Sequence, residues 1–181
     1  MKNPFGNSFS DQWLRRVFFA CAAVMLLIML SVSGRYGVCW DEKTQKDYGD
    51  SVLNFYTSFG KDTGYINRQN HIHTYGGFVE VVCSVATKIS SADPYDTRHF
   101  IIAWFGFFAM LFAGLVAKEI AGWKAGIVSL LFVFLTPVFF GHSMFNSKDI
   151  PFAACYTAGI YFLIRFLKEL PSPSRKSVIY L

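Results

Sequence analysis

The stretch Val17–Val32, VFFACAAVMLLIMLSV, determines the class of fold because it contains 16 consecutive residues without a charge. Trp13 and Leu14 extend it toward the N-terminus. A helix of this length approaches the thickness of the hydrocarbon core of a bilayer. Because a segment in lipid must satisfy its backbone hydrogen bonds internally, the stretch predicts a transmembrane helix.

The same stretch has a second interpretation, a secretory signal peptide. Arg15 and Arg16 precede the apolar core, and the small residues of 31–33 precede Gly34, as at a cleavage site. Trp13 favours a retained membrane anchor, because Trp concentrates at the membrane interface. Both interpretations place the residues that follow on the same side of the membrane.

Three further blocks have the same apolar character. Phe100–Ala117 and Ile150–Leu167 contain 18 residues each, and Ala125–Phe140 contains 16. Their one charge is Arg165, near the end of its block, where a long side chain can reach the headgroups. The four blocks together predict an all-α integral membrane protein, a multi-spanning helical bundle with about four transmembrane helices.

The composition agrees with this class. Of the 181 residues, 53% are hydrophobic and 16% charged, and 20 are Phe. These values exclude a disordered chain and argue against a water-soluble globule. The four cysteines have no CxxC spacing, so no metal site is expected from them, and the sequence leaves open whether Cys39 and Cys83 pair.

The charges outside the blocks indicate the orientation. The N-terminal region carries a net +2, the 118–124 link +1 and the residues from Arg165 onward +3. By contrast, 34–98 sums to −1 and 141–149 to zero. By the positive-inside rule the three basic regions are cytoplasmic. The pI of about 9.0 therefore reflects topology, and no nucleic-acid partner is expected.

The blocks and the charges together predict a membrane topology. We expect the protein in the bacterial inner membrane, with its outer segments facing the periplasm. The predicted order is a cytoplasmic tail (1–12), transmembrane helix 1 (13–33), an outer loop (34–98), transmembrane helix 2 (99–117), a cytoplasmic turn (118–124), transmembrane helix 3 (125–140), an outer loop (141–149), transmembrane helix 4 (150–167), and a cytoplasmic tail with the opening of a fifth helix (168–181).

The 65-residue outer segment is too long for a bare connection and contains two stretches with helical periodicity. Apolar residues recur at helical spacing in Asp41–Phe59 and again in Gly76–Ile89. We predict two helices that lie in the plane of the membrane interface. The alternative is a small soluble cap that packs on itself.

Acidic residues stand where two predicted spans meet the outer surface. Asp41 and Glu42 follow the first span closely, and Asp149 immediately precedes the fourth. Each has an ordinary structural interpretation, because carboxylates favour helix N-termini and Asp149 could cap a helix that has Pro151 in its first turn. Their position on one face of the membrane favours a functional site. They would meet there if the first and fourth spans packed together.

This arrangement resembles the glycosyltransferase-C superfamily, specifically glycosyltransferase family 39, the branch of protein O-mannosyltransferases and aminoarabinose transferases. The resemblance covers essentially all of 13–170 and depends on the order of short features. These are Asp41-Glu42 after the first span, interfacial helices, Arg98 opening the second span, Lys118 to Gly122 at the inner turn, Pro137 late in the third span, and Asp149 at the mouth of the fourth in GHSMFNSKDIPF.

The resemblance implies transfer of a sugar from a polyprenyl-phosphate donor to a hydroxyl of a protein, lipid or glycan acceptor. A lipid phosphate leaves as a stable anion, so one general base suffices, unlike the two carboxylates of a glycosidase. Asp41 is the candidate base, and attack from the opposite face inverts the anomeric centre. Glu42 would position the acceptor, and Asp149 would orient the donor or Asp41.

The resemblance also implies that two cations and one amide side chain bind the phosphate of the donor. Lys148 and Arg98 would neutralise the departing phosphate, with Asn146 as a further contact; headgroup anchoring is the alternative for both cations. No cofactor is expected, although Mg²⁺ would be compatible with an acidic site.

The chain departs from the family pattern in two places. His71-Ile-His73 stands where many relatives have a His-Pro-Pro turn, and the family has further membrane helices. The chain therefore resembles the N-terminal portion of a longer enzyme. The alternatives from other classes are a small multi-spanning transporter, whose acidic residues bind a cation or proton, and a structural membrane subunit.

Overall fold

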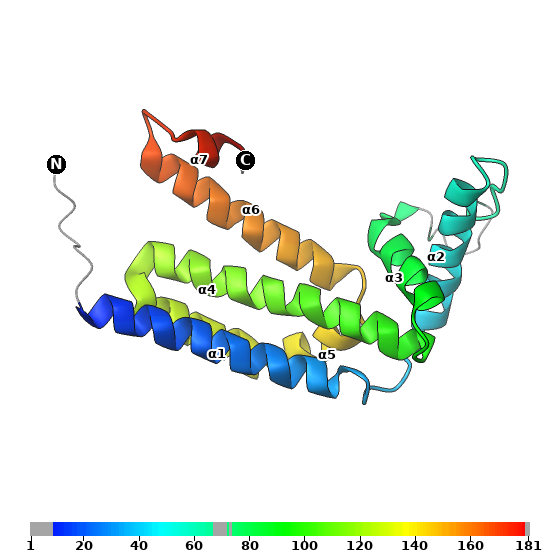
Figure 1. Cartoon of the computed structure of the whole chain (residues 1–181), viewed down its shortest axis with the longest axis horizontal. Helices are drawn as coiled ribbons and strands as arrows, with labels where there is room; N and C mark the ends of the chain where they lie inside the picture. Colours follow the sequence, from blue (N-terminus) through cyan, green and yellow to red (C-terminus); the bar gives the residue numbers. More distant parts are fainter. Residues whose placement is uncertain (1–8, 67–71, 73, 180–181) are drawn as a thin grey trace.

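The computed structural model describes residues 9–66, 72 and 74–179, and within these ranges the secondary structure is helical, with no strand. This confirms the all-α class (Figure 1). The helices are α1 (Phe9–Ser33), α2 (Glu42–Thr57), α3 (Phe78–Ile89), α4 (Pro94–Leu135), α5 (Pro137–Phe145), α6 (Asp149–Glu169) and α7 (Arg175–Ile179).

Three of the described helical segments are long and apolar enough to cross a membrane: Ser10–Ser33, Pro94–Leu135 and Asp149–Glu169. By length and composition, the chain therefore fits a multi-pass membrane protein. The number of spans and their orientation stay predictions.

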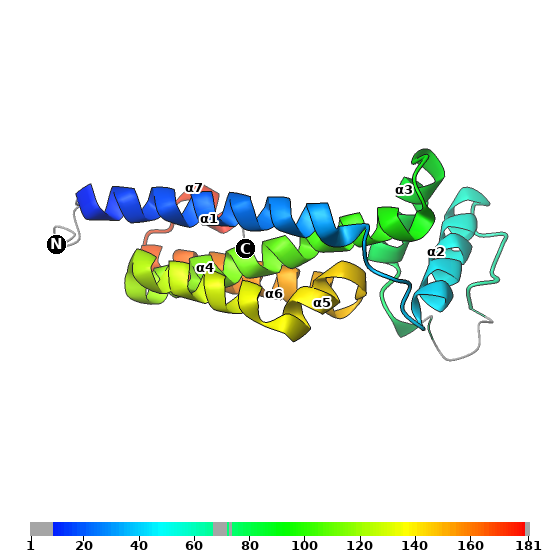
Figure 2. The same cartoon turned by 90° about the horizontal axis from the view of Figure 1, so that it is seen from below.

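Helix α4 turns back on itself. At 42 residues it would be about 63 Å long if straight, roughly twice the hydrocarbon thickness of a bilayer. Its backbone leaves helical geometry at Ala121 and at Gly122, whose φ of 83° suits glycine. Figures 1 and 2 show the two arms returning side by side, so the reversal falls within the predicted 118–124 turn.

Small residues let these arms approach each other. A Cβ atom on Gly126 would lie 2.9 Å from the Lys118 Cβ and 3.0 Å from the Gly114 carbonyl oxygen. A Cβ on Gly114 would lie 2.8 Å from the ring of Phe18, which is completely buried. Close backbone approach at small residues is the usual way in which membrane helices gain packing energy.

The structure differs from the predicted helix over 125–140. That helix is interrupted at Thr136, and a separate helix, α5, begins at Pro137 and continues to Phe145, into the predicted outer loop. Proline has no N–H for the helical ladder, and it disfavours helical geometry in the residue before it. Thr136 accordingly adopts an extended conformation, with φ −76° and ψ 108°.

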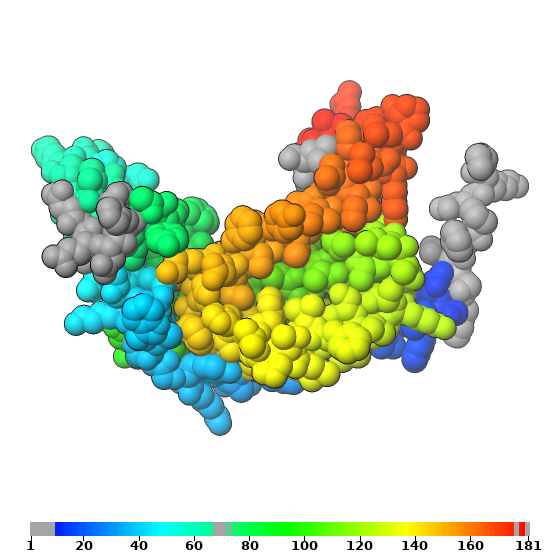
Figure 3. All heavy atoms as spheres, turned by 180° about the vertical axis from the view of Figure 1, so that it is seen from behind, coloured from blue at the N-terminus to red at the C-terminus, as the bar shows by residue number. Residues whose placement is uncertain are grey.

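Helix α4 is the centre of the bundle. Helices α1, α5 and α6 all pack against it, and Figure 1 shows α1 and α6 on opposite sides of it. Met29, Met110 and Met144 contribute to a buried core shared by α1, α4 and α5. The surface is hollowed along α6, between the α2–α3 pair and the end of α6 with α7 (Figure 3), which leaves a face of α6 for lipid or further helices to cover.

The two ends of the bundle differ. The start of α1, the reversal of α4 and the end of α6 lie at one end, and α2, α3 and the α5–α6 link lie at the other (Figures 1 and 2). The three basic regions of the sequence therefore share one end, as their common cytoplasmic assignment requires. Which compartment each end faces stays a prediction.

Helices α2 and α3 form where the periodicity predicts them. Helix α2 falls within 41–59 and α3 within 76–89, and they pack against each other around Tyr48, Val52 and Ile72. The backbones of α2 and α3 come close at Gly49. A Cβ atom on Gly49 would lie only 2.7 Å from the Glu80 carbonyl oxygen.

We therefore expect Gly49→Ala to lower the free energy of unfolding in detergent by about 1–3 kcal/mol, because the added methyl group overpacks the α2–α3 contact. Unfolding in a dodecyl sulfate titration, followed by circular dichroism, measures this. Gly159→Ala on α6 is the matched control, since a Cβ there has no atom within 4 Å. Equal stability of the two variants would contradict the close approach.

Candidate functional site

Asp41 stands at the N-terminus of α2 but does not cap it. Its side chain makes no capping hydrogen bond with the helix backbone. Instead, Asp41 Oδ2 accepts a hydrogen bond of 2.6 Å from Gln45 Nε2 and lies 3.5 Å from Lys148 Nζ. The side chains of Lys148 and Asp41 are 34% and 32% exposed, so the pair is open to a ligand. The structural interpretation of Asp41 as an ordinary cap therefore does not describe its contacts.

Lys148 belongs to the link between α5 and α6, which Asn146 holds in shape. Asn146 Oδ1 accepts hydrogen bonds from the backbone N–H groups of Lys148 (3.1 Å) and Asp149 (2.9 Å). Asn146 Nδ2 donates to Asp149 Oδ2 at 2.9 Å and lies 3.0 Å from His142 Nδ1. Asp149 is exposed. Asn146 is thus engaged in local contacts that order the start of α6.

Tyr75 completes the surroundings of Lys148. The Lys148 ammonium lies 5.0 Å from the centre of the Tyr75 ring, within the range of a cation–π interaction. The hydroxyl of Tyr48 on α2 donates to the Tyr75 carbonyl oxygen at 3.2 Å and so ties this residue to the helix pair. Burial raises the pKa of Tyr48, with smaller contributions from Tyr65 and Glu80, so its hydroxyl stays protonated as a donor.

Glu42, the neighbour of Asp41, points into the protein. Both its side chain and that of His99 are completely buried, with Glu42 Oε1 2.8 Å from His99 Nε2. Glu42 Oε2 accepts a 2.6 Å hydrogen bond from the backbone N–H of Cys39. Glu42 therefore joins the start of α2 to α4 and has no exposed surface for an acceptor.

Arg98 is also completely buried. Its Nη2 donates to Glu80 Oε2 at 2.6 Å, and Glu80 on α3 is nearly buried as well. The guanidinium atoms Nε and Nη1 have no hydrogen-bond partner among the described residues. Burying a charged group is costly unless it is paired, so this ion pair fixes α3 against the start of α4.

Ser147 connects the exposed and the buried parts of the site. Its Oγ is within hydrogen-bond distance of Gln45 Oε1 and of Glu80 Oε1. A hydroxyl carries one proton, so Ser147 donates to one of these oxygens at a time. A continuous series of polar contacts thus runs from Asp41 through Gln45, Ser147 and Glu80 to Arg98.

This series corrects one expectation about how the acidic sites meet. Asp41 reaches the 146–149 link through the N-terminal turn of α2 and through Lys148, while α1 and α6 each pack against α4. Packing of the first apolar helix against the fourth is therefore not what brings the two regions together.

Four residues of the site were not predicted from the sequence: Gln45, Glu80, His99 and Ser147. Glu80 had a detectable signal, because it is the one acid in the apolar stretch 76–89. His99 follows Arg98 directly at the start of an apolar block, which is also an unusual place for two polar side chains. Gln45 and Ser147 are ordinary polar residues in the sequence, and only their contacts distinguish them.

The cysteines and the candidate metal ligands add little to the site. The four cysteines are free, and burial raises the pKa of Cys83 to about 12, outweighing the opposite effect of Arg98. Within the described ranges, no three His, Cys, Asp or Glu side chains are grouped to hold a metal ion, and the expectation about cofactors stays a prediction. His71 and His73 lie outside the described residues.

Comparison of the chain with protein-family models, with curated proteins and with solved structures gives no match. The resemblance to glycosyltransferase family 39 therefore depends on the residue pattern alone.

Removing one partner of the buried Glu80–Arg98 ion pair should lower the free energy of unfolding far more than removing one partner of an exposed pair. We expect Glu80→Leu to lower the free energy of unfolding by about 3–5 kcal/mol, because it leaves Arg98 buried without a counter-charge. Lys46→Gln, which breaks the half-exposed pair of Lys46 with Asp50, should cost at most about 1 kcal/mol.

Unfolding in detergent measures both variants, and the double variant Glu80→Leu with Arg98→Met should recover most of the loss. Equal effects of Glu80→Leu and Lys46→Gln would show that the buried pair does not hold α3 to α4.

Cysteine labelling tests the predicted orientation. In single-cysteine variants, Cys39, which is half-buried and precedes Asp41 by two residues, should react with a membrane-impermeant maleimide added from outside. Cys83 should react only after unfolding, because it is completely buried and, with a pKa of about 12, carries almost no thiolate at neutral pH. Labelling of Cys39 only after the membrane is permeabilised would reverse the orientation.

Proposed function

We propose that this chain acts as a membrane glycosyltransferase that moves a sugar from a polyprenyl-phosphate donor to an acceptor hydroxyl at the outer face of the membrane, with inversion. The observation that carries the proposal is the half-exposed Asp41–Lys148 pair at one end of the apolar helices. A carboxylate and an ammonium group 3.5 Å apart offer a base and a phosphate contact in one place.

In this proposal Asp41 is the general base. Its carboxylate is held by Gln45 on one side and makes no helix cap, so it retains acceptor capacity for the proton of an incoming hydroxyl. The acceptor oxygen forms its bond to the anomeric carbon as the bond from that carbon to the phosphate oxygen breaks. The acceptor proton passes to Asp41, and the lipid phosphate leaves with the bonding electron pair.

Lys148 contacts the phosphate of the donor as negative charge develops on it. Asn146 and Asp149 act beside it, Asn146 by fixing the backbone that presents Lys148 and Asp149 by its exposed carboxylate at the mouth of α6. Neither Arg98 nor Glu42 is exposed, so we propose that both position α2, α3 and α4 and do not touch the donor.

An apolar groove at the start of α6, lined by Asp149, the residue after Lys148, supports a lipid-linked donor. A cavity of about 400 Å³ lies between α5 and α6, with His142, Asn146 and Asp149 among its lining residues. Its remaining walls include Phe139 and Ile150, which suit a hydrocarbon chain. A polyprenyl tail in this groove would bring its phosphate to the polar residues.

The test is sugar transfer from a radiolabelled polyprenyl-phosphate sugar in membranes that contain this protein. Asp41→Asn should lower kcat by about 10²–10⁴-fold, because it removes the base while it keeps the size of the side chain. Asp62→Asn, at an exposed loop carboxylate, should leave the rate unchanged.

Unchanged transfer in Asp41→Asn would remove the proposed mechanism. Proton-coupled uptake of a solute, with no transfer, would favour the transporter. The position of the carboxylates argues against that alternative, because those of the three apolar helices lie near helix ends or beside the reversal of α4, not along a path through the bundle.

A further inference from the structure

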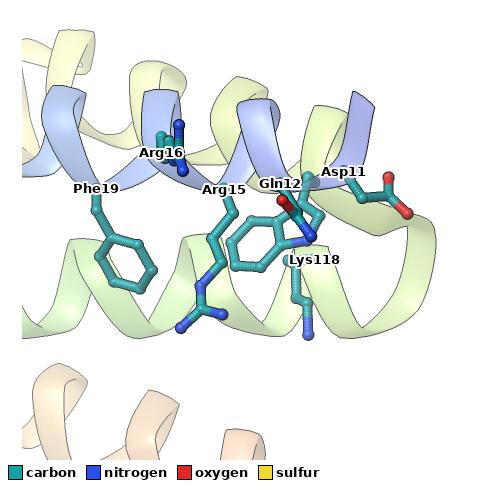
Figure 4. Close-up of a pocket in the computed structure, with 7 residues that line it drawn as sticks. Asp11, Gln12, Arg15, Arg16, Phe19 and Lys118 are labelled. Atoms are coloured by element: carbon teal, nitrogen blue, oxygen red, sulfur yellow. The ribbon is translucent and has the colours of Figure 1, made fainter. Parts of the chain in front are cut away.

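A second polar site lies at the opposite end of the bundle from Asp41. A cavity of about 710 Å³ opens between the first turns of α1 and the reversal of α4. Figure 4 shows its lining residues, with Arg15 and Lys118 extending to the same side and Asp11 pointing away from Arg15. None of these residues takes part in the proposed transfer reaction.

The cavity is basic. Three of its seven lining residues are cations, Arg15, Arg16 and Lys118, and Asp11 is its one carboxylate. Arg15 and Arg16 are exposed, whereas Lys118 is held by a 2.7 Å ion pair with Glu119. Of the two exposed arginines, Arg15 extends to the same side as Lys118 (Figure 4), and a guanidinium group binds phosphate through paired hydrogen bonds.

The other wall of the cavity is aromatic. Phe19 and Trp123 line it, with ring centres 6.2 Å apart, and the Lys118 ammonium lies 5.1 Å from the centre of the Trp123 ring. Phe19 is exposed on α1, at the start of the apolar stretch that the protein presents to the membrane. A ligand that fits both walls has an anionic head and an apolar body.

We infer that this cavity binds the headgroup of an anionic phospholipid from the surrounding membrane. The phosphate would lie against the guanidinium group of Arg15, on the side to which Lys118 also extends (Figure 4), and the acyl chains would run along Phe19 toward the bilayer core. Basic pockets between membrane helices are suited to such headgroups, and Trp favours the same depth. A free phosphate would use the cations but leave the aromatic wall without a function.

The experiment is native mass spectrometry of the purified chain in detergent, titrated with phosphatidylglycerol or with phosphatidylcholine of the same acyl chains. We expect phosphatidylglycerol to be retained preferentially and Arg15→Gln to weaken that retention about fivefold. Arg15→Lys should weaken it less, because it keeps the charge. Lys61→Gln, at an exposed cation in the loop after α2, is the matched control and should not change it.

Measurement in detergent separates lipid binding from any effect of Arg15 on membrane orientation, and circular dichroism establishes that each variant is folded. Equal retention of the two lipids, or unchanged retention of phosphatidylglycerol in Arg15→Gln with Arg16→Gln, would overturn the inference. Full competition by soluble glycerol phosphate would also overturn it, because the site would then recognise the free anion. The result is independent of sugar transfer, so the two proposals can fail separately.

Discussion

The ion pair between Glu80 and Arg98 is the interaction on which the end of the bundle that carries α2 and α3 depends. Both side chains are buried, so neither charge is stable without the other. The pair fixes α3 to the start of α4, and Glu80 also reaches Ser147 in the α5–α6 link. Because Ser147 contacts Gln45 and Gln45 holds Asp41, the position of the half-exposed Asp41 carboxylate depends on a buried charge pair.

The contrast between Asp41 and Glu42 shows how one helix start can serve two purposes. Adjacent residues on a helix point about 100° apart, so the two carboxylates cannot share one environment. Glu42 is buried against His99 and anchors α2 to the membrane helices, whereas Asp41 stays accessible beside Lys148. A rigid anchor next to a reactive group is the arrangement that a positioned base requires.

Much of the fold was predictable because its signals are local. The apolar blocks, the periodicity of 41–59 and 76–89 and the turn around Gly122 depend on neighbouring residues, and each appears in the structure. The break at Thr136 differs from the predicted helix over 125–140, because Pro137 disfavours helical geometry in the residue before it even within an uncharged run. Of the predicted site residues, Asp41, Lys148 and Asn146 lie within one connected set of contacts. The same set includes three residues that were not predicted: Glu80, Ser147 and Gln45.

The sequence by itself determined the class of protein, since the length and apolarity of its blocks and the placement of its basic residues follow from the properties of a bilayer. Tertiary structure alone decided which polar residues became a site. Contacts such as Ser147 with Glu80, 67 residues apart, arise from helix packing, and no local pattern encodes them. Burial then separated the charges that hold the fold, Arg98 and Glu42, from those that remain available to a ligand, Asp41 and Lys148.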